Sequence, residues 1–338
     1  MVSSGRPTIR TVAARAGVGR TTVSRVLNGS PLVSRQARAA VEAAIAELGY
    51  VPDPAARSLV TRRTESIALV IPEQESRLSE EPYFSDVIRG VGDALAGTRV
   101  QLLLILVRGP RERDRLTEFL TARRVDGVLL TSVHRDDPLP GLLRRLDLPA
   151  VLAGRRWPGE PMNHAHADNA GGARLAVRHL LERGRRTVAT ITGPLDMDVA
   201  AARRAGWRDG LREAGLTPDR DLAEPADFGH DGGRAAMRAL LERRPGLDAV
   251  FAASDVMAAA ALAELRRHGR RVPQDVAVAG FGDSVVARHT DPPLTSVRQP
   301  VAEIGRTITR MLLEEIAGRS SGRHRVTLPT SLVVRESA

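Results

Sequence analysis

Residues 8–29 read TIRTVAARAGVGRTTVSRVLNG, and this stretch decides the fold of the N-terminal part of the chain. From Ile9 to Ala16 the apolar residues recur at i, i+3, i+4 and i+7, which is the spacing of one helical face. Gly17-Val18-Gly19 interrupts the pattern as a tight turn would. The helical pattern resumes over residues 20–28, so the stretch predicts two short helices joined by a turn.

The second predicted helix turns Val23, Val26 and Leu27 inward and leaves a polar surface. Thr21 and Arg25 lie four residues apart and so share that surface. Its other members are Arg20, Ser24 and Asn28. A short helix that presents Arg, Thr, Ser and Asn can enter the major groove of DNA and hydrogen-bond to base edges. We therefore interpret residues 8–29 as a helix-turn-helix.

Positive charge is concentrated at the N-terminal end of the chain. The formal net charge is +10, and residues 1–63 hold ten arginines against three acidic residues. The remaining residues are nearly balanced, with 40 arginines against 37 acidic residues. A basic module on a near-neutral body is typical of a DNA-binding protein, although a basic solvated surface would also give this distribution.

Composition excludes several other classes of protein. The chain has 338 residues, too many for one ordinary core, which predicts a small domain and a larger two-lobed one. No apolar run of about 18 residues could span a membrane, and the N-terminus lacks the apolar segment of a secretory signal. Cysteine and lysine are both absent, which excludes disulfides, thiolate metal sites, thiol nucleophiles, Walker A loops and Schiff-base lysines. We therefore expect a cytoplasmic protein without a metal or cofactor.

A third helix is predicted over residues 34–48, because Ser34 can cap its start and Gly49 can end it. Pro52-Asp53-Pro54 then breaks the chain, and only the short helix-capable stretch AARSLV follows. A helix this short is unstable alone in water. Residues 52–63 are therefore predicted to form a linker that becomes helical only when a partner holds it.

From Ser66 onward, apolar runs alternate with amphipathic segments of helix length. The predicted strands are 67–72, 100–107, 125–130, 148–154, 187–193, 247–254 and 276–282, and the predicted helices include 83–96, 170–183, 201–214 and 255–268. Continuous apolar strands between helices indicate parallel sheets covered on both faces. Two such series predict an α/β body of two doubly wound lobes, with a ligand site in the cleft between them.

The chain as a whole resembles the LacI/GalR family of bacterial transcription regulators. The resemblance is carried by AGVGRTTVSRVLNGSPLVS (16–34), ELGYVPDPAARSL (47–59), PYFSDVIRGV (82–91), VDGVLL (125–130), HADNAGGARLAVRHLLERGRRTVATITGP (166–194) and DPPLTSVRQP (291–300). It implies an all-α helix-turn-helix domain at 1–51, a hinge at 52–63, and a body at 64–338 like the periplasmic sugar-binding proteins. The lobes it implies are 64–164 with 295–327, and 165–294 with 328–338.

The resemblance implies DNA contacts residue by residue. Arg20, Thr21 and Arg25 match the base-reading positions of the recognition helix, which agrees with the fit of arginine to guanine O6 and N7. Phosphate contacts or helix-capping roles are implied for Thr8, Thr22, Ser24, Asn28 and Ser34. Leu59 matches the hinge leucine that is pushed into a minor-groove step beside its symmetry mate, although it could simply pack two linkers together. Arg57 is expected at a backbone phosphate.

The resemblance also implies a small effector, most often a sugar, between the lobes. The residues expected to contact it are Tyr83, Phe84, Asp168, Arg203, Trp207, Ser254, Asp255 and Asp283. Aromatic faces stack on sugar rings or purines, and the Arg203 guanidinium offers a planar fork to paired hydroxyls or a carboxylate. Core packing of either Tyr83 or Phe84 is an equally good interpretation.

Three positions depart from the family's pattern. Gly19 stands where the recognition helix usually begins with Ser or Asn, Ser254 where sugar-binding members often carry Asn, and Gly282 where the first Asp of Gly-Phe-Asp-Asp is usual. The departures at 254 and 282 remove two polar side chains that usually contact the sugar in this family. Either nearby carboxylates replace them, or the effector differs. The acidic stretch PEQESRLSEE (72–81) is longer than the minimal family loop and is a candidate for the cleft rim.

Two other function classes fit the sequence less well. An enzyme on a doubly wound scaffold would lack a nucleophile elbow here, and Gly17-x-Gly19 follows a helix where a nucleotide fingerprint follows a strand. His164-x-His166-x-Asp168 could ligate a metal, but such alternation more often means exposed histidines. A transport protein that binds solutes would need a signal peptide. The sequence thus predicts a homodimeric DNA-binding regulator, most simply a repressor, whose partners are operator DNA and a carbohydrate-type effector.

Overall fold

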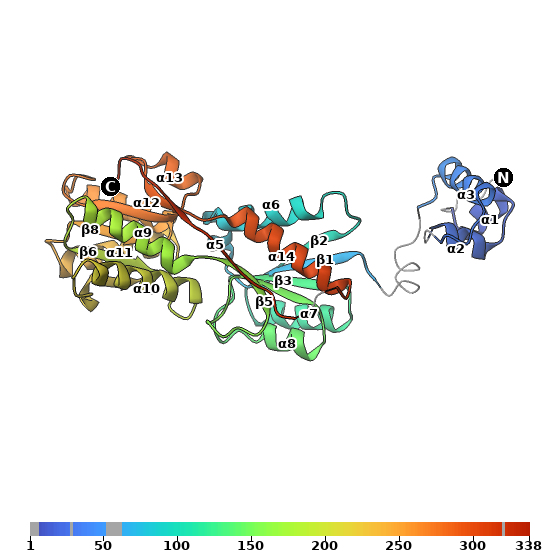
Figure 1. Ribbon diagram of the computed structural model, residues 1–338, viewed down its shortest axis with the longest axis horizontal. Coiled ribbons are helices and arrows are strands. Elements are labelled where there is room, and N and C mark those ends of the chain that lie inside the picture. Colours follow the sequence, from blue (N-terminus) through green and yellow to red (C-terminus); the bar gives the residue numbers. More distant parts are fainter. Residues whose placement is uncertain (1–6, 28–29, 52–62, 320–321) are drawn as a thin grey trace. The chain divides into compact units, whose positions relative to one another are not determined.

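The structure, a computed structural model, describes residues 7–27, 30–51, 63–319 and 322–338 (Figure 1). The chain divides into two compact units, residues 1–65 and 66–338. The first is helical and the second contains two sheets. Each unit is described by itself below.

The first unit consists of three short helices whose ends follow the capping residues. They are α1 (Ile9–Ala16), α2 (Arg20–Leu27) and α3 (Arg35–Leu48). The hydroxyl oxygens of Thr8 and Ser34 accept backbone N–H groups of α1 and α3 at 3.4 Å and 3.2 Å. Gly17 and Gly49 end the same helices in the left-handed region, with φ of 65° and 59°, where glycine has no Cβ to clash.

The helices of the first unit share one small core. Its buried members are Val12, Ala13, Val23, Val26, Val41 and Ala44. They come from all three helices at helical spacing, so the apolar stripes read from the sequence face one another. An exposed ion pair between Arg15 Nη2 and Glu47 Oε2, at 2.6 Å, joins α1 to α3 but adds little stability because solvent screens it.

The first lobe of the second unit is a six-stranded parallel sheet in the order β11-β5-β4-β3-β1-β2. Its strands are β1 (Ser66–Ile71), β2 (Gln101–Leu106), β3 (Gly127–Thr131), β4 (Ala150–Ala153), β5 (Asn163–Ala167) and β11 (Arg325–Leu328). Its helices are α5 (Glu75–Glu80), α6 (Tyr83–Leu95), α7 (Pro110–Thr121), α8 (Leu139–Arg145) and α14 (Val301–Ile316). Helices α6 and α14 pack on one face of the sheet, and α7 and α8 pack on the other.

Helices α6 and α14 approach each other closely because small residues meet at their crossing. A Cβ added at Gly90 of α6 would lie 2.0 Å from the backbone oxygen of Ala302 in α14, which no side chain could tolerate. This contact fixes the start of α14, which follows directly on a crossing between the lobes.

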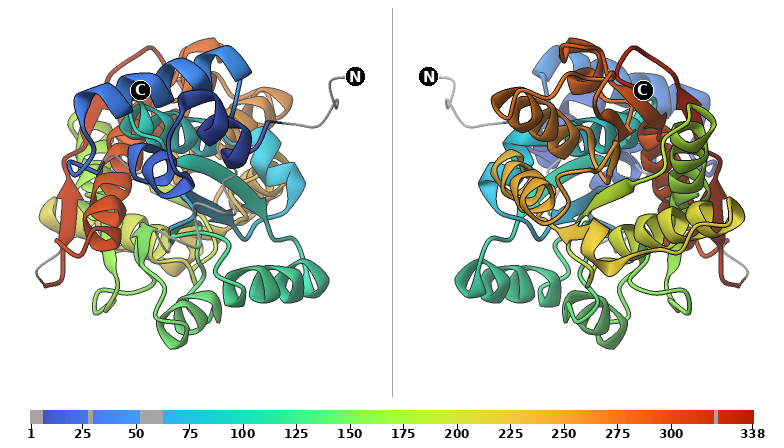
Figure 2. Two further views of the ribbon diagram at one scale, coloured as in Figure 1. Left: turned by 90° about the vertical axis from the view of Figure 1, so that its right-hand side faces the viewer. Right: turned by 90° about the vertical axis from the view of Figure 1, so that its left-hand side faces the viewer.

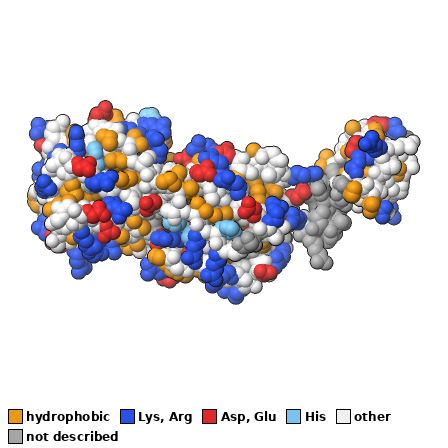
Figure 3. Space-filling model, viewed as in Figure 1, with side chains coloured by type: hydrophobic (Ala, Val, Ile, Leu, Met, Phe, Trp, Pro, Cys, Tyr) orange, Lys and Arg blue, Asp and Glu red, His pale blue; other side chains and the backbone are white. Residues whose placement is uncertain are grey.

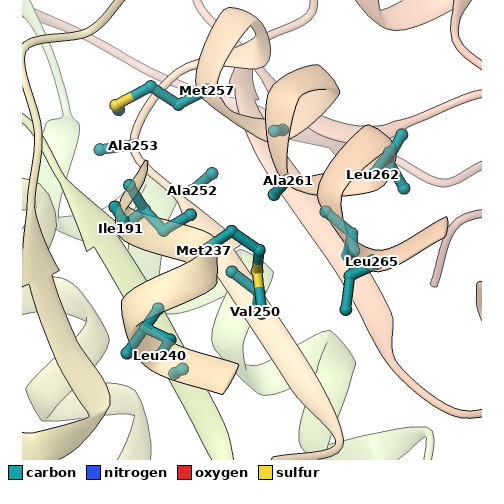
Figure 4. Packing of buried hydrophobic residues seen from close by; sticks show 14 of the residues in the cluster. Ile191, Met237, Leu240, Val250, Ala252, Ala253, Met257, Ala261, Leu262 and Leu265 are labelled. Atoms are coloured by element: carbon teal, nitrogen blue, oxygen red, sulfur yellow. The ribbon is translucent and has the colours of Figure 1, made fainter. Parts of the chain in front are cut away.

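The second lobe is a six-stranded sheet in the order β12-β10-β9-β8-β6-β7, parallel apart from the antiparallel β12. Its strands are β6 (Val188–Thr192), β7 (Ala223–Pro225), β8 (Ala249–Ala252), β9 (Ala277–Gly282), β10 (Thr295–Arg298) and β12 (Ser331–Val333). Its helices are α9 (Asn169–Glu182), α10 (Asp198–Glu213), α11 (His230–Arg243), α12 (Asp255–Arg267) and α13 (Val285–His289), with a 3-10 turn at Arg220–Leu222. Figure 2 shows helices on both sides of this sheet, and Figure 4 shows α11 and α12 packed on one of them through Met237, Leu240 and Leu265.

The chain crosses between the lobes after β5, after β10 and after β11, so each sheet receives strands from distant parts of the sequence (Figure 1). The implied lobe borders differ from the observed ones in two places. Strand β10 (Thr295–Arg298) pairs with β9 in the second lobe, although residues from 295 were expected in the first. Strand β5 (Asn163–Ala167) lies wholly in the first lobe, past the expected border at 164.

Charged side chains of both signs cover the second unit. On the face seen in Figure 3, arginine and acidic side chains are interspersed over both lobes. This agrees with the near-balanced composition of the chain beyond residue 63. Among the described residues, no helix is both long enough and apolar enough to cross a membrane.

Candidate functional site

A cavity lies between the two lobes, where the carboxyl ends of their strands meet. About 990 Å³ of space free of protein atoms lies within it, the solvent at its open mouth included. The first lobe contributes residues that follow β3 and β4 and end β5. The second lobe contributes residues that follow β6 and β8 and end β9. The doubly wound pattern predicted a cleft at this place.

Aromatic rings and hydrogen-bonding groups both line the cavity. Tyr83, Phe228 and Phe281 supply the rings. The Tyr83 hydroxyl lies 3.1 Å from Thr131 Oγ1, and burial raises the pKa of Tyr83, so the phenol stays neutral. Flat apolar rings beside convergent polar groups suit a ligand with apolar ring faces and hydroxyl edges.

Arg203 is the most constrained polar residue of the cavity. Its Nε donates to Asn169 Oδ1 at 2.9 Å, and one of its terminal nitrogens donates to the Ala253 carbonyl at 2.6 Å. The other terminal nitrogen donates to Gln299 Oε1 at 3.3 Å. The guanidinium also lies 3.8 Å from the centroid of the Phe281 ring. Burial lowers the pKa of Arg203 to about 10, so the side chain remains charged at neutral pH.

Asp255 lines the same cavity from the first turn of α12. Its two carboxylate oxygens accept hydrogen bonds from Ser296 Oγ at 2.5 Å and from the Ser284 N–H at 2.7 Å. Burial raises the pKa of Asp255, and these two hydrogen bonds oppose that shift. Beside it, Gly282 has φ of 137°, and a Cβ there would lie 2.9 Å from Asp255 Oδ2. In this backbone conformation an aspartate at 282 would be strained, and glycine avoids that strain.

Three of the eight residues predicted to contact an effector line this cavity: Tyr83, Arg203 and Asp255. The other five do not, and each has a structural role instead. Phe84 is 1% exposed in the core beneath α6 and meets the Tyr83 ring edge-to-face. Trp207 is 2% exposed in the core beneath α9 and α10, with its indole N–H donated to the Val188 carbonyl at 3.1 Å.

The remaining three predicted residues are polar but satisfied elsewhere. Asp168 caps α9 by accepting the Gly171 N–H at 2.8 Å, and Ser254 caps α12 by accepting the Met257 N–H at 3.2 Å. Asp283 is paired with two arginines, Arg298 and Arg335. Asp168 and Ser254, each in a short connection between a strand and a helix, thus serve as helix caps, which is a role their position favours.

The sequence analysis missed most of the residues that line the cavity, Phe228, Phe281 and Gln299 of the second lobe among them. Two of the missed residues of the first lobe are Arg77 and Glu81. They come from the acidic stretch at 72–81, which folds as the short helix α5 and was only a candidate for the cleft rim. The Arg77 guanidinium lies 4.8 Å from the centroid of the Phe228 ring of the second lobe. Arg77 also hydrogen-bonds to Glu73 and, at 3.2 Å, to Ser132 Oγ. A charge pattern alone gave no sign that this segment would enter the cavity.

A polar clasp formed by Glu73 and His134 of the first lobe and Asp196 of the second joins the two lobes. His134 Nδ1 lies 2.6 Å from Asp196 Oδ2, and its Nε2 lies 3.8 Å from Glu73 Oε1. The Arg135 N–H also donates to the Asp196 carbonyl at 3.0 Å. The two carboxylates, Glu73 first, raise the pKa of His134 from 6.5 to about 9. The histidine is therefore charged at neutral pH and attracts a carboxylate of its own lobe, Glu73, and one of the other lobe, Asp196.

The clasp predicts a pH-dependent stability. A raised folded-state pKa means that protonated His134 stabilises the protein fully below pH 6.5, and that this contribution is lost as the pH rises through about 9. We expect the thermal midpoint of the wild type to exceed that of His134→Asn at neutral pH by a few degrees at most, because the side chain is 37% exposed. The two midpoints should converge in alkaline buffer. If the difference between the two thermal midpoints stayed constant from neutral to alkaline pH, protonated His134 would not be the source of the stabilisation.

The predicted DNA-contacting residues lie on or beside α2 in the first unit. Arg20, Thr21 and Arg25 are exposed on α2, and Thr22 and Ser24 on the same helix are partly buried. Thr8 and Ser34 are the caps of α1 and α3. The predicted contacts Asn28, Arg57 and Leu59 lie outside the described residues. Because Val23 and Val26 of α2 are buried, the helix can present only its polar face to a groove.

The histidine pair of β5 does not form a metal site with its neighbours. His164 is buried, not exposed as the sequence interpretation had it, and its Nδ1 lies 2.9 Å from the Met162 carbonyl. His166 lines the cavity, with its Nδ1 2.8 Å from the Ala167 carbonyl. Burial lowers the pKa of both histidines, so both are neutral. Within the described part of the chain, no group of three or more His, Cys, Asp or Glu side chains could hold a metal ion.

Two family models match the chain. One, described as bacterial regulatory proteins of the lacI family, matches residues 8–53, and one described as a periplasmic binding protein-like domain matches residues 177–338. The HTH-type transcriptional regulator CelR of Thermobifida fusca is 50% identical over 334 residues, which cover 98% of each chain. The ribose operon repressor of Escherichia coli (strain K12) is 35% identical over 335 residues, covering 98% of this chain and 99% of that protein.

Two solved structures are similar over nearly the whole chain. A complex of the transcriptional regulator CelR with cellobiose matches with a TM-score of 0.80 and 48% identity, covering 98% of this chain and 100% of that one. The lac repressor dimer bound to operator and the anti-inducer ONPF matches with a TM-score of 0.85 and 27% identity, covering 98% and 99%. Both the helical unit and the two-lobed unit therefore have counterparts in one protein chain.

Proposed function

Because the chain belongs to the LacI family of bacterial transcriptional regulators, and is thus a DNA-binding regulator and not an enzyme, we propose that it is a repressor controlled by a cellobiose-type disaccharide. The sugar binds in the cavity between the lobes. The observation that carries this proposal is the cavity itself, whose rings at Tyr83, Phe228 and Phe281 stand beside the charged donor Arg203. The resemblance to CelR over the whole chain supports the choice of sugar.

The DNA-binding part of the proposal rests on the basic first unit. We infer that the protein binds a pseudo-palindromic operator as a homodimer in the cytoplasm, with Arg20, Thr21 and Arg25 reading bases in each half-site. Residues 1–51 form the DNA-binding domain, and residues 52–63 form the hinge that carries Arg57 and Leu59. The lac repressor dimer bound to operator, which is similar to this chain throughout, supports the dimeric arrangement.

The proposed mechanism is thermodynamic linkage between the cavity and the operator. A sugar that prefers one arrangement of the two lobes changes the operator affinity by its differential affinity for the two arrangements. The clasp of Glu73, His134 and Asp196 and the three crossings between the lobes are the elements that such a rearrangement would alter.

Operator binding measured with and without sugar tests the proposal. DNA from upstream of the gene, labelled with a fluorophore, is titrated with the full-length protein alone and with cellobiose, ribose or hypoxanthine. We expect cellobiose to change the operator affinity by roughly 5–150-fold, the usual size of such coupling. Cellobiose at about 100 times its Kd should also stabilise the fold by about 2.7 kcal/mol in a thermal-shift assay. An equal response to ribose or hypoxanthine, or no response to cellobiose, would overturn the choice of ligand.

A further inference from the structure

Among the described residues, most charged groups of the cavity are paired with a group of opposite charge, whereas Arg203 and Asp255 are hydrogen-bonded to uncharged groups. Arg77 is paired with Glu73, and Arg155 Nε lies 2.7 Å from Asp198 Oδ2. Arg203 differs, because the three acceptors of its hydrogen bonds in the described structure, Asn169, Ala253 and Gln299, are all uncharged. Its positive charge therefore has to be balanced from a greater distance.

Arg203 also keeps hydrogen-bonding capacity for a ligand. A guanidinium has five N–H groups, two on each terminal nitrogen. In the described structure each terminal nitrogen of Arg203 donates to a single acceptor. The residue is only 6% exposed and lines the cavity, so the remaining N–H groups are largely shielded from bulk water. A ligand oxygen in the cavity is their natural acceptor.

Glu81 is the carboxylate of the first lobe that favours the positive charge of Arg203. It follows α5 directly, lines the same cavity as Arg203 and has a side chain only 14% exposed. Its nearest cation is Arg77, whose Nη2 lies 3.5 Å from Glu81 Oε2, at the long limit of hydrogen bonding. Burial raises the pKa of Glu81, and Arg77 and Arg203 oppose that shift. Glu81 is also the charged group with the largest influence on the pKa of Arg203.

The other carboxylates of the cavity are less free to bind a ligand. Both oxygens of Asp255 already accept hydrogen bonds, and Asp198 is paired with Arg155. Asp86 is paired with Arg89, whose Nη2 lies 2.7 Å from Asp86 Oδ1. Of the cavity carboxylates, Glu81 thus has the weakest contacts with other protein groups. Arg203 is the corresponding charged group of the second lobe.

We propose that Glu81 is a specificity residue, which together with Arg203 selects an uncharged, hydroxyl-rich ligand and rejects an anionic one. A hydroxyl can donate its hydrogen to the Glu81 carboxylate and accept an N–H from Arg203, so one sugar satisfies both lobes at once. A ligand carboxylate or phosphate would pair with Arg203 but would also lie beside Glu81, whose charged form is favoured by the neighbouring Arg77 and Arg203, in a site largely removed from water. The inference rests on the proposed function, that the cavity binds a cellobiose-type sugar.

Substitution of Glu81 by glutamine tests the role of its charge. Binding of cellobiose, cellobionate and cellobiouronate to the full-length protein is measured by calorimetry, because the two acids carry one carboxylate at opposite ends of the same disaccharide. We expect the wild type to prefer cellobiose over at least one acid by tenfold or more, and Glu81→Gln to reduce that preference about tenfold, or ~1.4 kcal/mol. Cellobiose itself should bind roughly 10–100-fold more weakly, because a hydrogen bond to a charged group is lost.

Two further variants separate charge from structure. Glu75→Gln removes a charge from the same short helix, but Glu75 is 77% exposed and paired with Arg108, so its affinities should equal those of the wild type. Glu81→Asp keeps the charge and should keep the rejection of the acids. The thermal midpoint of each unliganded variant shows that it is folded, and if Glu81→Gln does not fold, the Glu81→Asp result alone decides.

The two hypotheses fail in different ways. If the wild type binds none of the three disaccharides, the proposed function is wrong and the role of Glu81 is wrong with it. If the wild type binds cellobiose, two results overturn the specificity assignment alone. The first is an unchanged preference for cellobiose over the acids in Glu81→Gln. The second, which decides where Glu81→Gln does not fold, is a lost preference in Glu81→Asp.

Discussion

Replacing Arg25 by alanine is expected to abolish specific operator binding while sugar binding stays unchanged. Arg25 is exposed on α2, whose buried face at Val23 and Val26 leaves only the polar face for DNA. A bidentate arginine–guanine contact is worth ~1–3 kcal/mol, and the proposed dimer would lose two of them, so the operator affinity should fall by ~2–6 kcal/mol. Fluorescence anisotropy with operator DNA and with scrambled DNA of equal length measures the specific and the non-specific affinity.

Arg35→Ala is the matched control for this experiment. It removes the same charge from the exposed start of α3, outside the recognition helix. We expect it to weaken binding to operator and scrambled DNA alike, because only the sequence-independent attraction to phosphates changes. If Arg25→Ala behaved in the same uniform way, α2 would not be the helix that reads bases.

Replacing Arg203 by alanine is expected to remove the stabilisation of the protein by cellobiose. The guanidinium holds Asn169, the Ala253 carbonyl and Gln299 in place and keeps N–H groups for the ligand. Loss of two ligand hydrogen bonds to a charged group, at ~1.5–3 kcal/mol each, corresponds to binding that is weaker by roughly a hundredfold or more. Calorimetry and the thermal-shift response to cellobiose measure this loss.

The design of this second experiment has to separate a lost contact from a lost fold, since Arg203 is buried. Arg203→Lys keeps the charge but not the planar fork, and should bind cellobiose weakly while remaining folded. Arg208→Ala, on the exposed side of the same helix, should behave as the wild type. Operator binding without sugar reports that each variant is intact. Full cellobiose affinity in a folded Arg203→Ala would remove this residue from the site.

The three-helix unit could be predicted from the sequence in detail because its signals are local. The capping hydroxyls of Thr8 and Ser34 and the left-handed glycines at 17 and 49 act within a single helical turn. The apolar runs of the lobes were equally readable, since a strand buried on both faces needs uninterrupted apolar residues. Strands such as Ser66–Ile71 and Val188–Thr192 accordingly lie within a residue or two of their predicted places.

The strands that the sequence did not reveal depend on distant partners. Strand β5 reads NHAHA and β11 reads RVTL, neither of which is a continuous apolar run, and they pair with each other across about 160 residues of chain. Helix α5 is a short polar segment with no apolar period. Such elements are specified by the assembled sheet or cavity, so local patterns do not identify them.

The five predicted ligand contacts that do not line the cavity have a different explanation. Phe84, Val87 and Val91 stand at i, i+3 and i+7 and are all buried beneath α6, so helical spacing could have assigned Phe84 to the core. Trp207 stands four residues before the buried Leu211 in the same way. Motif position placed both residues near the cavity, but the face of the helix on which a side chain lies decides whether it reaches a ligand.

The late position of β11 and β12 in the chain affects the order in which the protein can mature during synthesis. Each of the two sheets takes its last strand from residues 325–333, whereas the three helices at 9–48 need only one another. Domains fold while the chain is synthesised, N-terminal end first. The DNA-binding domain can therefore be folded well before the sugar-binding domain is complete. A chain interrupted by a late stop codon would therefore lack an edge strand in both lobes, so we expect it to lose sugar control before it loses contact with DNA.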